Sequence, residues 1–196
     1  RVVRITNPKL IDSKQVKNVQ ALLAMDMTQE KPGKLVPRLG NPDRRVRMKT
    51  QLELARREAV GFLARVAKNS SKKRLARMHA IWGLGHVARK TTNARKRRTA
   101  VAVLPELMAA KDPWLRAAVV TVMGDLGDRE FAEPLQTALQ DEDLRVRSLA
   151  AIAIGKTGAE QVVDSLVSMI ADNNDQDVVL RHAGVMGLLG TASEAE

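Results

Sequence analysis

A pattern of residues recurs five times along the chain, and its regularity limits the possible folds more than any other feature. Each copy centres on an arginine, with a charged residue four positions earlier and apolar side chains one position before and seven positions after the arginine. The spacings between the arginines are 30, 39, 31 and 34 residues. Periods of this length are typical of architectures in which each repeat packs only against its neighbours. The arginines are Arg47, Arg77, Arg116, Arg147 and Arg181, and the residues four positions earlier are Asp43, Lys73, Asp112, Asp143 and Asp177.

Each copy of the pattern has the features of a helix that begins just after the charged residue. An aspartate there can cap a helix by accepting a hydrogen bond from a free amide of the first turn. In the third copy Asp112 is followed by Pro113, which suits the first position of a helix because no amide hydrogen is needed there. Glycines at positions 127, 158 and 190 stand where three of these helices are expected to end. A shorter apolar segment precedes each helix, so the sequence predicts helix pairs at about 33–56, 58–90, 94–127, 129–157 and 160–190, with a further helix at about 12–26.

The composition favours a core made of closely spaced helices. Only 2% of the residues are aromatic and none is tyrosine, whereas 44% are hydrophobic. Sandwiches of β-sheets use aromatic and β-branched side chains on their strands, so this composition favours helices over strands. Glycine and alanine recur in the second helix of each pair, where they would let neighbouring helices approach closely. We therefore predict an all-α fold, a right-handed α-α superhelix of about five helix pairs with an N-terminal capping helix.

The unit that begins at Asp112 resembles a known repeat. Its sequence Asp-Pro-x-Leu-Arg-x-Ala, followed by Gly-x-Leu-Gly, is similar to HEAT repeats, and the similarity covers about residues 33–190. The resemblance implies an armadillo-like solenoid in which aspartates and arginines form a ladder between successive repeats. The second copy departs from the pattern, because it has Lys73 where the others have aspartate. The residues that the resemblance assigns to the ladder are Asp43, Arg47, Arg77, Asp112, Arg116, Asp143, Arg147, Asp177 and Arg181.

Longer runs of residues resemble a narrower group, the large exported bacterial proteins labelled membrane-bound dehydrogenases. These proteins combine a sugar-dehydrogenase-like β-propeller, HEAT repeats and a c-type haem domain. The resemblance implies a location in the periplasm or cell envelope and a spacer between those two domains. The runs that carry it are Arg-Val-Val-Arg-Ile-Thr at 1–6, Asn-Pro-Asp-Arg-Arg-Val-Arg at 41–47, Arg-Met-His-Ala-Ile-Trp-Gly-Leu-Gly at 77–85 and Leu-Arg-His-Ala-Gly-Val-Met-Gly-Leu at 180–188.

The sequence pattern divides the chain into four expected parts. Residues 1–6 alternate apolar and polar side chains like a strand, so we expect residues 1–11 to be the extended tail of an upstream β domain. Residues 12–32 then form the capping helix and a linker, residues 33–190 the solenoid, and residues 191–196 a tail. No apolar run approaches the length of a membrane span, so we expect no membrane insertion by these residues.

Charge is distributed unevenly and suggests where a partner binds. Residues 1–100 carry 26 Lys and Arg against 6 Asp and Glu, whereas residues 101–196 carry 7 against 16. A partner with acidic groups would be attracted to the first half, and a nucleic acid would be attracted by its phosphates. Trp114 follows a helix cap and is expected to be exposed, whereas Trp82 is expected in the core. The candidate interaction residues are Lys72, Lys73, Arg74, Arg95, Lys96, Arg97, Arg98 and Trp114.

Residues that carry out chemistry are sparse. The chain has no cysteine, and its three histidines stand at spacings that do not suit a shared metal. We find no nucleophile–base arrangement, phosphate-binding loop or dinucleotide motif. The sequence therefore predicts no cofactor, no metal and no enzymatic activity, and the main hypothesis is a protein-binding scaffold. Two alternatives stay open: a nucleic-acid-binding HEAT module of the DNA glycosylase kind, and a lyase-type HEAT protein that handles a tetrapyrrole.

Overall fold

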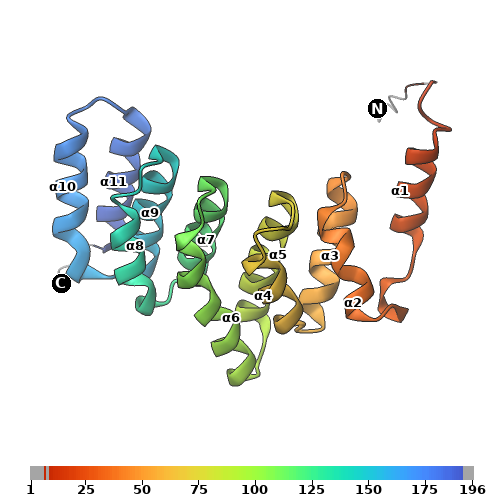
Figure 1. The fold of residues 1–196 in the computed structure, drawn as a ribbon. Helices are drawn as coiled ribbons and strands as arrows, with labels where there is room; N and C mark the ends of the chain where they lie inside the picture. The colour runs from red at the N-terminus through yellow and green to blue at the C-terminus, as the bar shows by residue number, and fades with distance from the viewer. Residues whose placement is uncertain (1–6, 8, 192–196) are drawn as a thin grey trace, which may run out of the picture.

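The helices stand side by side in one curved row, from α1 at one end to α10 and α11 at the other (Figure 1). The computed structural model describes residue 7 and residues 9–191, and within them it contains helices and short 3₁₀ turns but no strand. The predicted all-α solenoid is therefore confirmed. The expected strand-like segment at residues 1–6 lies outside the described residues, as does most of the expected tail at 191–196.

Five repeats can be followed along the row, and each ends in a long second helix. The first repeat begins with a short helix and a 3₁₀ turn that contains Pro37, instead of a full first helix. The helix expected at 12–26 is α1 (Lys14–Ala24). The repeats are α2 (Pro32–Leu35) with α3 (Arg44–Arg56), α4 (Val60–Lys68) with α5 (Arg74–Lys90), α6 (Ala94–Glu106) with α7 (Pro113–Leu126), α8 (Ala132–Ala138) with α9 (Leu144–Thr157), and α10 (Val163–Asn173) with α11 (Val178–Thr191).

The second helices pack against one another in sequence and form one continuous layer. Helix α3 contacts α5, α5 contacts α7, α7 contacts α9 and α9 contacts α11. Small residues make these contacts close: a Cβ added at Gly124 of α7 would lie 2.6 Å from the Cβ of Ala153 in α9. The core runs along the whole solenoid as one cluster of buried Ala, Leu, Val, Ile and Met side chains with a single buried Phe. The shortage of aromatic residues thus corresponds to thin, closely spaced helices.

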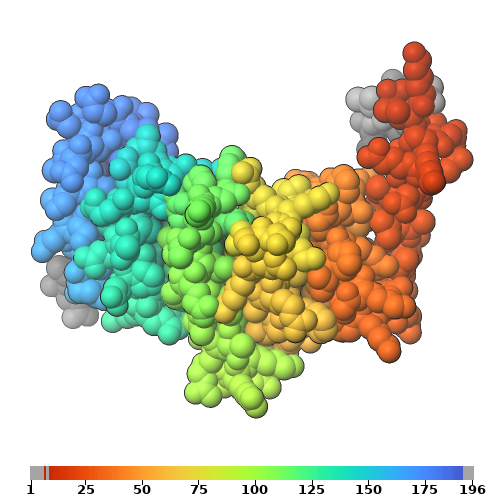
Figure 2. All heavy atoms as spheres, viewed as in Figure 1, coloured from red at the N-terminus to blue at the C-terminus, as the bar shows by residue number. Residues whose placement is uncertain are grey.

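Helix α6 projects from the row, as the ribbon and the space-filling view both show (Figures 1 and 2). It packs on α4 and α5 through its second half, where Ala100, Val101, Val103 and Leu104 are buried. Its first two turns carry the basic run Arg95–Arg98, which contains no apolar side chain to bury. The longest spacing between two arginines of the repeat therefore corresponds to a helix whose basic start extends beyond the packed layers.

Aspartates cap the second helices, as the sequence predicted. Asp43 accepts a hydrogen bond from the N–H of Arg45 (2.8 Å), and Asp112 accepts one from the N–H of Trp114 (3.1 Å). Asp143 and Asp177 cap α9 and α11 in the same way. In the second repeat Lys73 stands at the cap position and makes no side-chain hydrogen bond to the helix.

Within the described residues, every helix is too short or too polar to span a lipid bilayer.

Candidate functional site

The five repeated arginines lie at one edge of the solenoid, where the second helices begin; we call it the ladder edge. Each arginine belongs to the first turns of α3, α5, α7, α9 or α11, so the side chains of the first four can reach toward the next repeat. We call an arginine and the residue that it meets in the next repeat a rung. The ladder edge has four such positions between its five repeats.

The rung at Arg116 is closed by a carboxylate. Arg116 donates from Nε and Nη2 to the two oxygens of Asp141 at 2.7 and 2.8 Å, and from Nη1 to the carbonyl oxygen of Ala110 at 2.8 Å. Only 7% of Arg116 is exposed. Burial alone would raise the pKa of Asp141, but hydrogen bonds from Arg116 and from the N–H of Asp143 outweigh burial and hold that pKa below its usual value. This bidentate pair joins the turns of the third and fourth repeats.

The rung at Arg47 is closed by a neutral histidine. Arg47 donates from Nε to Nε2 of His79 at 3.0 Å and from Nη1 to the carbonyl oxygens of Asn41 and Pro42. Because Nε2 accepts, Nδ1 of His79 carries the proton and donates to Oε1 of Gln51 at 2.7 Å. Burial of the ring, together with the charge of Arg47, lowers the pKa of His79 to about 4. An imidazole thus takes the place that a carboxylate has in the Arg116 rung.

The ladder partners therefore differ from the predicted ones. Asp43, Asp112, Asp143 and Asp177 were expected to bind the repeated arginines, but their carboxylates cap helices instead. Asp43 also binds Arg45 of its own helix, which holds the pKa of Asp43 at about 2, and Asp112 also binds Arg74. The residue that closes the Arg116 rung is Asp141, two positions before the capping aspartate. A capping carboxylate is held by the amides of its own helix, and Asp112, which also reaches back to the preceding repeat, meets Arg74 there and not the repeated Arg77.

The rung at Arg77 is open toward a pocket. Arg77 donates from Nε to the carbonyl oxygen of Ala67 at 2.8 Å, and its two terminal nitrogens have no hydrogen-bond partner among the described residues. The pocket has a volume of about 540 Å³ and lies between the turns before α5 and α7. Two of its cations are paired, since Lys68 binds Glu106 and Arg74 binds Asp112. Three further cations, Lys72, Arg77 and Lys111, line it without an acidic partner in the described part of the chain.

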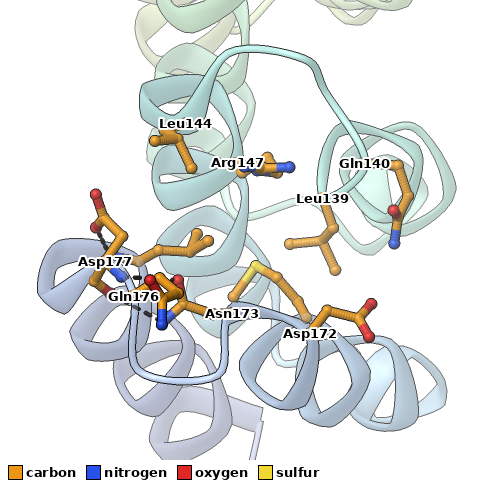
Figure 3. A pocket seen from close by; sticks show the side chains of 10 residues that line it. Leu139, Gln140, Leu144, Arg147, Asp172, Asn173, Gln176 and Asp177 are labelled. Carbon is orange, nitrogen blue, oxygen red and sulfur yellow. Dashed lines mark hydrogen bonds between the residues drawn. The ribbon is translucent and has the colours of Figure 1, made fainter.

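The rung at Arg147 is open as well, toward a second pocket between the fourth and fifth repeats (Figure 3). The Nε of Arg147 is buried, and it has no hydrogen-bond partner among the described residues. In the fifth repeat, Arg181 binds Asp175 of its own turn and is exposed. The first and third rungs are therefore closed, and the second and fourth are open.

The predicted interaction residues fall into two groups on opposite edges. Lys72 and Arg74 line the pocket at Arg77 on the ladder edge, where α5 begins, and Lys73 is exposed beside them. Arg95–Arg98 lie on the opposite edge, where α5 ends and α6 begins. There Lys96 binds Glu58 at 2.6 Å, and Arg97 binds Asp128 through both carboxylate oxygens. Arg95 and Arg98 remain exposed without an ion pair in the described residues.

Both tryptophans have polar neighbours. Trp114 is 46% exposed, as expected, and the guanidinium carbon of Arg145 lies 4.2 Å from the centre of its ring. Trp82 is partly buried against the core and meets the ring of His79 edge-on at 5.0 Å.

Within the described residues, no three His, Asp or Glu side chains gather in a way that could hold a metal ion.

Sequence reasoning missed two residues of the ladder edge, because Asp141 was interpreted as part of a turn and cap, and Lys111 was not singled out. The histidines were interpreted as bonding between helices, and His79 of α5 does so with Arg47 and Gln51 of α3. The neighbouring acids Asp141 and Asp143 could not be told apart by spacing alone. Only the path of the turn decides which of them faces the preceding repeat.

Comparison with known proteins supports the repeat and the fold. The family model for HEAT repeats matches residues 100–188. No curated protein matches the sequence. Among solved structures, the chain is similar to human deoxyhypusine hydroxylase, with 19% identity and a TM-score of 0.55 over 91% of this chain and 68% of that one.

Two further structures resemble the chain. One is the complex of CpcE and CpcF of phycocyanin lyase from Nostoc sp. PCC7120, with 18% identity and a TM-score of 0.60 over 87% of this chain and 68% of that one. The other is an engineered protein, with 15% identity and a TM-score of 0.52 over 91% of this chain and 82% of that one. At these identities the likeness is one of fold. The narrower resemblance to membrane-bound dehydrogenases stays a prediction.

The comparisons correct one prediction. The chain was expected not to be an enzyme, partly because a solenoid of this kind was taken as a scaffold. That expectation is wrong, because a hydroxylase and a lyase share the HEAT-like fold. The fold therefore supports a repeat scaffold or interaction module without excluding catalysis.

Proposed function

We propose that this chain is a protein-interaction module that binds an acidic segment of a partner in the pocket around Arg77. The observation that carries the proposal is the open rung, because Arg77 lines a pocket and its terminal nitrogens have no hydrogen-bond partner among the described residues. Lys72 and Lys111 line the same pocket without an acidic partner in that part of the chain. HEAT repeats and helical-repeat neighbours support a repeat scaffold or interaction module in general.

A carboxylate is the chemical group that this edge already binds. In the neighbouring Arg116 rung, the arginine at the same repeat position holds a carboxylate through two hydrogen bonds. Charge-assisted bidentate pairs of this kind are among the strong hydrogen bonds of proteins. An acidic side chain from a partner would accept hydrogen bonds from Arg77 in the same way. Lys72 and Lys111 would bind neighbouring acidic side chains of the partner.

Nucleic acid is less well supported as the partner. A phosphate backbone is bound by many cations on one surface, but Lys96 and Arg97 are already paired and lie on the edge opposite Arg77. Trp114, the more exposed of the two tryptophans, has Arg145 over its ring. The acidic second half of the chain would also repel a backbone that followed the solenoid.

The partner segment can belong to the same protein. The resemblance of four residue runs to exported membrane-bound dehydrogenases supports a position between a propeller and a haem domain in a larger protein of the cell envelope. In that setting an acidic segment of a neighbouring domain would bind the Arg77 pocket and fix the orientation of the solenoid. Expressing the neighbouring domains with and without the Arg77 substitutions described below would test this arrangement through their mutual affinity.

The experiment uses a fluorescein-labelled peptide of alternating Glu and Gly and measures its binding by anisotropy at about 50 and about 150 mM salt. One variant combines Lys72→Gln, Arg77→Gln and Lys111→Gln. Its matched control combines Arg89→Gln, Arg95→Gln and Arg98→Gln, which removes the same charge from exposed residues outside the pocket. We expect the pocket variant to weaken binding at least tenfold and the control less than twofold.

Duplex DNA serves as the competing ligand in the same assay. Binding of DNA that is tighter than binding of the peptide at about 150 mM salt, and that is lost in the control variant, would replace the protein-binding proposal by the nucleic-acid one. Equal losses in the two variants would mean that only net charge matters, and would overturn the assignment of the pocket.

A further inference from the structure

The pocket at Arg147 lacks the bound carboxylate that closes the Arg116 rung. Arg116 and Arg147 stand at the same position of successive repeats, and Arg116 uses Nε and Nη2 to hold Asp141. In Figure 3 the side chain of Arg147 extends from α9 toward Leu139 and Gln140. Its buried Nε has no hydrogen-bond partner among the described residues. The terminal nitrogens of Arg147 also make no hydrogen bond among the described residues, so an acceptor that enters the pocket can bind them.

The residue that would close this rung faces elsewhere. Asp175 stands two positions before the capping Asp177, as Asp141 stands two positions before Asp143. Asp175 binds Nη1 of Arg181 instead, and its side chain is 70% exposed. Asn174 and Asp175 both have positive φ, at 40° and 61°, whereas no residue of the turn before α9 does. The turn before α11 therefore follows a different path and leaves space beside Arg147.

The pocket beside Arg147 has a volume of about 330 Å³ and a mixed lining. Apolar side chains provide part of it, and the amide side chains of Gln140 and Gln176 provide hydrogen-bonding groups that suit a peptide backbone, whereas the amide of Asn173 is bound to the backbone of Asp177. Asp172 and Asp177 add acidic groups, so Arg147 does not make the lining basic overall. A ligand with only negative charges would be repelled. The apolar residues of the lining are Leu139, Leu144, Met169 and Leu180.

We propose that this pocket binds a partner peptide that presents a carboxylate to Arg147 and a neighbouring lysine or arginine to Asp172. The carboxylate would accept hydrogen bonds from the terminal nitrogens of Arg147, and an apolar side chain between the two charges would contact Leu139 and Leu144. The site is distinct from the Arg77 pocket, whose cations outnumber its acids and which suits a wholly acidic segment. The two open rungs thus select partner segments of different charge.

The test uses the capped tripeptide acetyl-Lys-Leu-Glu-amide as the probe and acetyl-Lys-Leu-Gln-amide as its uncharged counterpart. Both are titrated into the ¹⁵N-labelled protein, and amide chemical shifts are followed. We expect shifts confined to residues 139–147 and 172–180 with the first peptide, and at least tenfold weaker binding with the second. Arg147→Met should abolish the shifts. The matched control Arg145→Met removes an exposed arginine of the same helix and should leave the affinity within twofold.

Asp175 provides the discriminating outcome. If the rung is open in solution, Asp175→Asn will change neither the midpoint of urea unfolding nor the affinity for the first peptide. If Asp175 closes the rung itself, Asp175→Asn will lower the midpoint as much as Asp141→Asn does and the peptide will cause no shifts, which overturns the proposal. Equal affinity for the two peptides would overturn it too, because the pocket would then not recognise the carboxylate.

Discussion

Arg116 and Arg147 occupy the same position in neighbouring repeats, yet one is locked in a buried ion pair and the other borders an open pocket. Both belong to the first turns of a helix with an aspartate cap. The difference lies two residues before the cap of the next helix, where Asp141 turns back to Arg116 and Asp175 turns forward to Arg181. The path of one turn therefore decides whether a repeated arginine joins two repeats or is available to a ligand.

The first two rungs repeat this contrast with different chemistry. Arg47 is closed by His79, whereas Arg77 has only a carbonyl oxygen of its own repeat and a pocket. Closed and open rungs alternate along the edge, so each open pocket lies next to a closed rung. A closed rung fixes two repeats relative to each other and holds the neighbouring pocket in shape. Binding to such a pocket then carries no large entropic cost of ordering it.

The largest expected effect is at the closed rung of Arg116. Arg116→Met leaves Asp141 partly buried without its partner, and removing one member of a buried ion pair costs about 3–5 kcal/mol. We expect a loss of this size in the free energy of unfolding, measured by urea denaturation at neutral pH. The double variant Arg116→Met with Asp141→Leu should regain part of the loss, because no uncompensated charge remains. A loss below about 1 kcal/mol would show that this rung is no stronger than a surface ion pair.

The closed rung of Arg47 predicts that the free energy of unfolding depends on pH. The pKa of His79 is lowered to about 4 in the folded chain, so the unfolded chain takes up the proton first as the pH falls. The stability that His79 contributes is present above its unfolded pKa of about 6.5 and is lost as the pH falls toward 4, by up to about 3 kcal/mol. His79→Gln should flatten the stability curve between these values. Asp43 loses its own contribution mainly below about pH 4, between its unfolded pKa of 3.8 and its folded pKa of about 2, so most of that loss lies below the His79 range.

The close contact between α7 and α9 at Gly124 predicts a smaller effect. A Cβ at Gly124 would lie 2.8 Å from the Cα of Ala153, and this backbone atom cannot move without shifting α9. We expect Gly124→Ala to lower the free energy of unfolding by about 1–3 kcal/mol. Gly61→Ala is the matched control in α4, since a Cβ there would have no atom within 4 Å. The control should be neutral or stabilising by up to about 1 kcal/mol, because alanine favours helix.

The repeat and the fold could be predicted from the sequence because they depend on periodic features. Capping aspartates, apolar positions and small residues recur in each repeat, and the expected pair 94–127 matches α6 and α7 within a residue. The ladder could not be predicted in the same way. Asp141 and Asp143 are nearly adjacent acids, and only the backbone path between them separates a partner from a cap. The pairing of Lys96 with Glu58 joins residues 38 positions apart, so a run of basic residues gave no sign of it.

The smallest expected effect is at the open rung, and it distinguishes the two kinds of rung directly. If Arg147 had the acidic partner that the resemblance to HEAT repeats implies, Arg147→Met would cost roughly 1–3 kcal/mol. In the structure Arg147 makes no ion pair within the described residues and has a buried Nε without an acceptor. Methionine keeps most of the apolar stem and removes the unsatisfied donor, so we now expect a change below about 1 kcal/mol in either direction. Urea unfolding of Arg116→Met and Arg147→Met under the same conditions measures the contrast. Equal losses would mean that both rungs are closed in solution, and the difference between junctions and binding pockets along this edge would have to be abandoned.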